Sequence, residues 1–199
     1  MSNKPEMSNN NTNNPSHPYY PFLKWGFLHT SFMIYVRSHN SISDEDFMEL
    51  FGLHGYQKTH PPLPFLGRHV VFANDTEWTH IADDCGYTLW HSPKTVEAIE
   101  ILSKSYDVFR NSLGDIDNSF DFEYHQNGEL IRKFVFKHDV FKKTELIAVD
   151  MGRKLVGEPT AMDDLKSSSE KMFPEMTQAL GIARVTDPLQ HRFYSKKAS

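Results

Sequence analysis

119-SFDFEYHQNGELIRKFVFK-137 is the stretch of sequence that decides the fold. Two runs of alternating apolar and polar residues flank Asn127-Gly128. This pair suits a type I′ turn because both central residues of that turn need positive φ. The stretch therefore predicts a β-hairpin with a two-residue loop.

The loop also predicts which residues of the hairpin face each other. A regular register pairs Gln126 with Glu129 and brings Glu123 opposite Arg132, two side chains of opposite charge. The same register predicts that one face carries six residues: Phe120, Phe122, Tyr124, Ile131, Lys133 and Val135.

Further strands and helices are indicated on both sides of the hairpin. Short apolar or alternating runs predict strands at 25–36, 69–73, 77–82, 87–91, 105–111 and 144–152. The strand at 25–36 has apolar residues on both parities, which is typical of a central strand. Caps and apolar spacing predict helices at 43–52, 93–103 and 174–181, and three prolines predict a loop at 54–68.

These elements indicate an α+β fold, a mostly antiparallel sheet with two or three helices packed on one face. We expect one domain over residues 22–190. Residues 1–21, rich in Asn, Ser and Pro, predict a disordered tail, and residues 191–199 a frayed C-terminus.

Composition narrows the class of function. The chain has 199 residues, of which 39% are hydrophobic, and a formal net charge of -5, so a nucleic-acid partner is not expected. No apolar run reaches the roughly 18 residues of a membrane helix. The single cysteine, Cys85, and the polar N-terminus predict a cytoplasmic protein without a membrane contact.

The segment 78-WTHIADDCGYTLWH-91 is the strongest candidate for a metal site. His80, Cys85 and His91 are types that bind zinc, with Asp83 or Asp84 as a fourth ligand. Their spacing, H-x4-C-x5-H, matches none of the common zinc patterns. We therefore expect no metal or other cofactor and interpret the segment as two strands joined by a loop.

No other pattern predicts catalysis. Cys85 follows two aspartates, whose negative charge raises a thiol pKa and makes the thiol less reactive. The chain contains no GxxxxGK[ST], GxGxxG or GxSxG motif. A protein partner is more consistent with aromatic and acidic residues in irregular segments, for which the candidates are Tyr56, Phe65, Asp83, Asp84, Asp115 and Asp117.

Four segments together resemble a loose group of uncharacterised bacterial α+β proteins that includes toxin-immunity proteins. They are 76-TEWTHIADD-84, 102-LSKSYDVF-109, 117-DNSFDFEYHQNGELIRKF-134 and 152-GRKLVGEP-159. The resemblance implies a cytoplasmic protein that neutralises a partner by covering its active surface. It assigns no functional residue, since the group shares no site motif.

We therefore expect a non-enzymatic protein-binding domain, in the form of an immunity protein whose acidic balance complements a basic toxin. One alternative is a metal-dependent hydrolase that uses the segment 78–91. Another is an accessory protein of a larger assembly. The oligomeric state stays open.

Overall fold

The computed structural model describes residues 32–39, 41–60, 68–83, 88–90, 92–114, 119–139, 141–158, 169–183, 185 and 187–196. Nine strands lie in this part of the chain: β1 (Phe32–Val36), β2 (Gln57–Thr59), β3 (Arg68–Asn74), β4 (Thr79–Asp83), β5 (Val108–Leu113), β6 (Phe120–Gln126), β7 (Glu129–Asp139), β8 (Thr144–Gly152) and β9 (Arg192–Lys196). The helices are α2 (Asp44–Leu50), α3 (Pro93–Ser103), α5 (Ser169–Ala179) and the 3-10 turn η2 (Pro188–Gln190).

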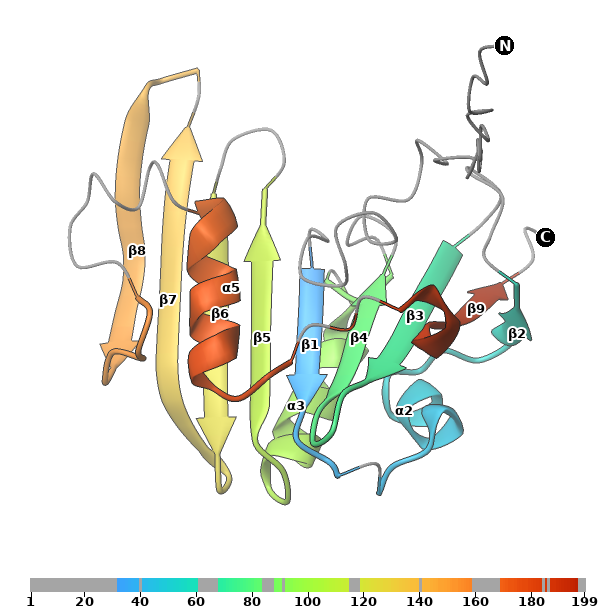
Figure 1. Ribbon diagram of the computed structural model, residues 1–199. Coiled ribbons are helices and arrows are strands. Elements are labelled where there is room, and N and C mark those ends of the chain that lie inside the picture. The colour runs from blue at the N-terminus through green and yellow to red at the C-terminus, as the bar shows by residue number, and fades with distance from the viewer. Residues whose placement is uncertain are drawn as a thin grey trace, which may run out of the picture.

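All nine strands form one sheet, in the order β2-β9-β3-β4-β1-β5-β6-β7-β8 (Figure 1). Every neighbouring pair is antiparallel. The expected antiparallel sheet is therefore confirmed, and β1 is the middle strand. All five of its residues are buried, because both faces of the sheet are covered there.

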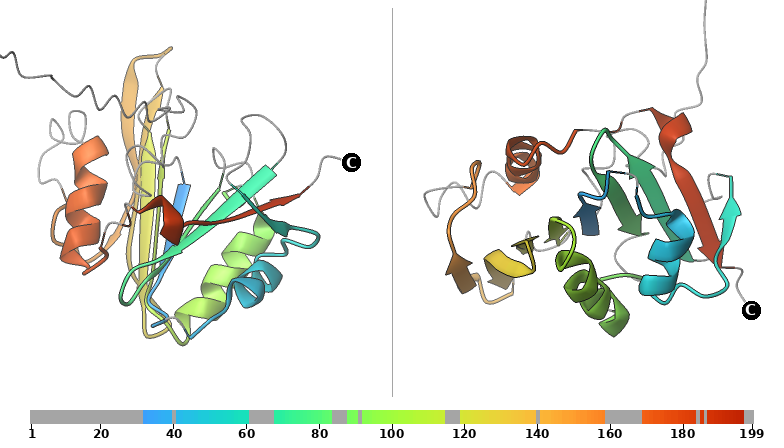
Figure 2. Two further views of the ribbon diagram at one scale, coloured as in Figure 1. Left: turned by 45° about the vertical axis from the view of Figure 1, so that its right-hand side comes forward. Right: turned by 90° about the horizontal axis from the view of Figure 1, so that it is seen from below.

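The helices lie on both faces of the sheet, which corrects the expectation of a single covered face. Figure 2 shows α5 on one side and α2 with α3 on the other. Two separate apolar clusters reflect this: α5 packs with Met33 and Phe122, whereas α2 and α3 pack with Ile34 and Phe72. Hydrophobic spacing shows that a helix has a buried face but not which side of the sheet that face covers.

The hairpin has the expected turn but a different register. Asn127 and Gly128 have φ of 53° and 80°, as a type I′ turn requires. A β-bulge between Tyr124 and His125 then shifts the pairing by one residue, so Glu123 faces Lys133 instead of Arg132. The shift brings four phenylalanines of the hairpin to the face that α5 covers: Phe120, Phe122, Phe134 and Phe136.

Several boundaries also differ from those expected. Residues 88–90 form a turn instead of a strand, and a three-residue strand, β2, lies within the expected loop. Helix α5 begins at Ser169 and contains Pro174 in its interior, whereas the sequence placed proline at its start. Residues 192–196, within the segment expected to fray, form β9, which pairs with both β2 and β3, and residues 197–199 lie outside the described residues.

Two helices begin where their capping residues predict. Ser43 and Asp46 form a capping box at the start of α2, and Pro93 opens α3 after Ser92, whose side chain makes no capping hydrogen bond. No helix in the described part of the chain is long and apolar enough to cross a membrane.

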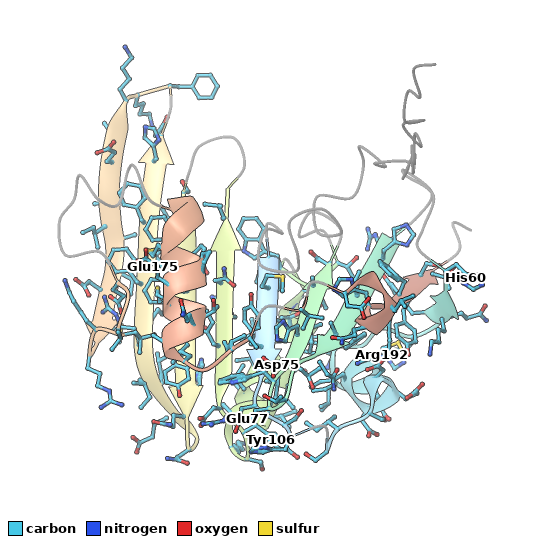
Figure 3. The ribbon with its side chains drawn as sticks, viewed as in Figure 1. His60, Asp75, Glu77, Tyr106, Glu175 and Arg192 are labelled. Carbon is cyan, nitrogen blue, oxygen red and sulfur yellow. The ribbon has the colours of Figure 1, made fainter. Side chains whose placement is uncertain are left out.

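Two arginine clusters hold the ends of the sheet. Arg192 of β9 lies beside α2 (Figure 3), where its guanidinium binds both carboxylate oxygens of Asp44 at 2.7 Å. At the other end, the fully buried Arg132 binds Glu158 at 2.8–3.1 Å and Asp150 at 2.5 Å. These ion pairs fix α2 and the turn after β8 against the sheet.

Candidate functional site

A groove of about 720 Å³ lies at the end of β5, β6 and β7, on the side of the sheet that carries α3. One row of paired residues forms its floor, from Ser112 on β5 to Asp121 on β6 and Val135 on β7. Its other lining residues are Trp90, Gly114, Ser119, Phe120, Phe136, Lys137, His138, Asp139 and Phe141. Most of this surface is aromatic, aliphatic or backbone.

The groove is open because the helices of its side cover only part of the sheet. In the right-hand view of Figure 2, α3 lies across β1 and β5 on this side of the sheet, and no described helix lies on the same side of β6, β7 and β8. On that open side, strand β8 presents Leu146 and Met151, which are 60% and 55% exposed. β8 is also the last strand of the described sheet and the neighbour of β7, so the groove lies one strand from this edge of the sheet.

Trp90 forms one wall of the groove, and a buried carboxylate positions it. The indole stacks on Phe32, with ring centroids 6.3 Å apart and planes 8° apart. Phe32 is paired with Ser112 and so continues, on β1, the row of paired residues to which the groove floor belongs. Asp83, at the end of β4, accepts hydrogen bonds from the backbone N–H groups of Thr88 (2.9 Å) and Leu89 (2.6 Å), which holds the turn that carries Trp90.

Phe141 stands at the opposite rim, in the turn between β7 and β8. Its side chain is 99% exposed. Asp139 holds the turn by accepting the backbone N–H groups of Phe141 (3.1 Å) and Lys142 (3.0 Å). The Lys142 backbone N–H and ammonium, which is 3.2 Å away, lower the pKa of the Asp139 carboxyl. The ring is thus exposed to solvent, next to backbone groups that Asp139 binds.

The next row of the same sheet face is a ladder of alternating charge. Glu123 of β6 lies between Arg110 of β5, at 2.9 Å, and Lys133 of β7, at 2.6 Å. Burial alone would raise the pKa of Glu123, but the interaction with His125, whose Nε2 is 3.6 Å away, and the hydrogen bond and charge of Arg110 outweigh it, so the pKa lies far below its usual range. Arg110 also binds Asp121 in the groove floor at 3.1 Å.

Lys137 differs from these paired groups. It lines the groove and is exposed, and its ammonium has no hydrogen-bond or ion-pair partner among the described residues. The two described carboxylates of the groove are already engaged, Asp121 by Arg110 and Ser112 and Asp139 by Lys142. The uncompensated charge of the described groove is therefore positive.

Three of the residues expected to form a site lie in the described part of the chain. His80 is fully buried, with Nε2 3.2 Å from Asp75 and its ring edge-on to Tyr35. Asp83 is 1% exposed, so its carboxylate is a structural acceptor and not part of a partner-facing surface. Tyr56 is half-buried, with its hydroxyl 3.4 Å from that of Thr88.

The remaining expected residues lie outside the described residues: Phe65, Asp84, Cys85, His91, Asp115 and Asp117. Two of the stretches that contain them are next in the chain to groove residues: Gly114 and Ser119 flank 115–118, and Trp90 precedes residue 91. No group of three His, Cys, Asp or Glu in the described ranges could hold a metal ion.

The sequence interpretation did not identify Phe141, Lys137 or Val135 as site residues. Phe141 had a local signal, since an aromatic residue next to Lys142 and Lys143 in a short connection between strands has no buried position to occupy. Lys137 and Val135 had none, because their place in a groove depends on the pairing of β7 with β6 and on Trp90.

A second groove, of about 600 Å³, separates α2 from α3. Its charged lining includes three carboxylates, Asp46, Glu49 and Glu97, and one ammonium, that of Lys94. Lys94 binds Glu97 at 2.6 Å. The acidic surface of the protein thus lies partly on these two helices, away from the first groove.

Comparison of the chain with protein-family models, with curated proteins and with solved structures gave no match. Its function has therefore to be inferred from its own residues.

Proposed function

We propose that this chain is a non-enzymatic protein-binding domain that receives a segment of its partner in the groove between Trp90 and Phe141. The exposure of Phe141 is the observation that carries the proposal. A phenylalanine that is 99% exposed and whose backbone N–H binds Asp139 gains no burial from the fold itself, and exposed aromatic residues are favoured at protein interfaces.

The shape and lining of the groove support a binding role. A volume of about 720 Å³ is within the range of ligand sites, which combine apolar walls with a few polar groups. The described hydroxyls and carboxylates of the floor are engaged with one another: Ser112 donates to Asp121 at 2.7 Å. An arrangement of this kind favours recognition over proton transfer or nucleophilic attack.

A more specific form of the proposal is that the partner is a basic toxin, which the chain neutralises. The net charge of -5 and the carboxylates of the α2–α3 groove support it, because complementary charge speeds association. Association with such a partner should slow markedly as ionic strength rises from about 0.01 to 0.15 M, when the screening length falls from about 30 to 8 Å. An association rate that does not change with salt would oppose this form.

Photo-cross-linking in the source cells tests the general proposal. A photoreactive phenylalanine analogue placed at position 141 should give one dominant protein adduct. The same analogue at Leu189 is a matched control, since that side chain is 93% exposed but precedes β9, on the other half of the sheet. No adduct at 141, or the same adduct at both positions, would contradict a binding site at the groove.

A further inference from the structure

We infer that the groove selects a partner segment that carries a bulky apolar side chain next to carboxylates. This inference rests on the proposed function and specifies the chemistry of the segment that enters the same groove. It follows from the apolar walls and from the uncompensated charge of the described groove residues, whose sign is opposite to the net charge of the chain.

The walls of the groove determine which apolar side chain the partner segment needs. Trp90 is held against Phe32 by the turn that Asp83 fixes, and Phe141 is the exposed wall opposite. Val135 lies in the floor between them. A large aromatic or branched side chain placed here would cover exposed carbon on three sides, as anchor residues at interfaces do.

Two lysines at the groove determine the charge that the partner segment needs. Lys137 lines the groove without an ion-pair partner among the described residues. Lys143, in the same turn as Phe141, is exposed and is likewise without one. The carboxylates of Asp121 and Asp139 do not offset these charges, because each already binds its own cation. A carboxylate on the incoming segment would supply the missing partner.

A selection experiment on the purified full chain tests the inference, with a displayed library of random twelve-residue peptides as the probe. We expect enriched peptides that combine an aromatic or branched apolar residue with neighbouring Asp or Glu. Lys137→Glu should reverse this charge preference, and it should weaken binding of an enriched acidic peptide about five- to tenfold, the effect of losing one exposed ion pair and gaining one repulsion.

Two further variants keep the test specific. Lys154→Glu makes the same charge change at an exposed position beyond the far end of β8 and should leave the preference unchanged. Trp90→Ala with Phe141→Ala should abolish enrichment while the far-ultraviolet circular dichroism stays the same.

The outcomes separate the two proposals. Enriched peptides without acidic residues, or a preference that Lys137→Glu does not change, would overturn the inference and leave the protein-binding function standing. No enrichment at all, together with binding of dodecanoate at the groove, would overturn both, since the site would then take an amphipathic carboxylate in place of a peptide.

Discussion

The buried Arg132 gives the sharpest prediction for the fold, because two carboxylates of different exposure bind the same guanidinium. Glu158 is 4% exposed and binds it through both oxygens, whereas Asp150 is 48% exposed. Glu158→Ala removes the buried partner and leaves a buried charge poorly compensated, which costs about 3–5 kcal/mol. Asp150→Ala removes an exposed partner, and such pairs contribute only about 0.2–1 kcal/mol.

Urea unfolding followed by circular dichroism measures both changes. For a domain of this size, each kcal/mol also lowers Tm by about 2–4 °C, so the two variants should be easy to distinguish. Replacing Arg132 by Met in the Glu158→Ala background should recover much of the loss, since it removes the uncompensated charge. Equal destabilisation by the two alanine variants, or no recovery with Met, would refute the assignment of Glu158 as the essential partner.

Three other predictions concern backbone geometry, pH and the wall of the groove. Gly152→Ala should destabilise the fold by at least about 2 kcal/mol more than Gly181→Ala: both residues have positive φ, but only at Gly152 would a Cβ meet a backbone atom, the Ile131 oxygen, at 2.0 Å. Similar unfolding midpoints for the two variants would contradict this. Burial lowers the pKa of His69, so the folded state binds its proton less readily than the unfolded state. The stabilisation from burying the neutral ring of His69 is therefore complete above about pH 6.5, the pKa of an unfolded histidine. It is lost as the pH falls from there towards the lower pKa of the folded state. His69→Phe should flatten part of the slope of stability against pH in this window, and an unchanged slope would show that the ring is accessible to protons. Asp83→Ala leaves two backbone N–H groups of the Trp90 turn without their acceptor and should cost about 1–3 kcal/mol in urea unfolding; a smaller cost would mean that the carboxylate does not hold the turn.

Local patterns in the sequence predicted the parts of the fold that depend on local chemistry. The type I′ turn at Asn127-Gly128, the capping box of Ser43 and Asp46 and the proline start of α3 are each determined within a few residues. The central position of β1 also followed from its own apolar residues.

The parts that were mispredicted depend on distant contacts. The bulge after Tyr124 satisfies the packing of the hairpin phenylalanines under α5, a helix more than forty residues later in the chain. The sequence of β9 resembles a polar chain end. It forms a strand because β2 and β3 supply its hydrogen-bond partners. Neither contact leaves a periodic signal in the segment concerned.

The candidate site also depends on contacts between distant segments, which the sequence does not show. The sequence predicts that the segment 78–91 is a candidate site, but its described residues have structural roles: His80 is buried against Asp75, and Asp83 holds the turn that brings Trp90 to the groove. The groove itself combines residues from β5, β6, β7 and the turn before α3, and no single segment carries its pattern.

The affinity of the partner recovered by cross-linking at position 141 tests the central claim most directly. Calorimetric titration of that partner should show that Phe141→Asp weakens binding at least about thirtyfold, as removal of an aromatic anchor worth about 2 kcal/mol or more does. Leu189→Asp, which places the same charge at an equally exposed apolar position, should bind like the unaltered chain. Undiminished affinity of the Phe141→Asp variant would contradict recognition through the groove.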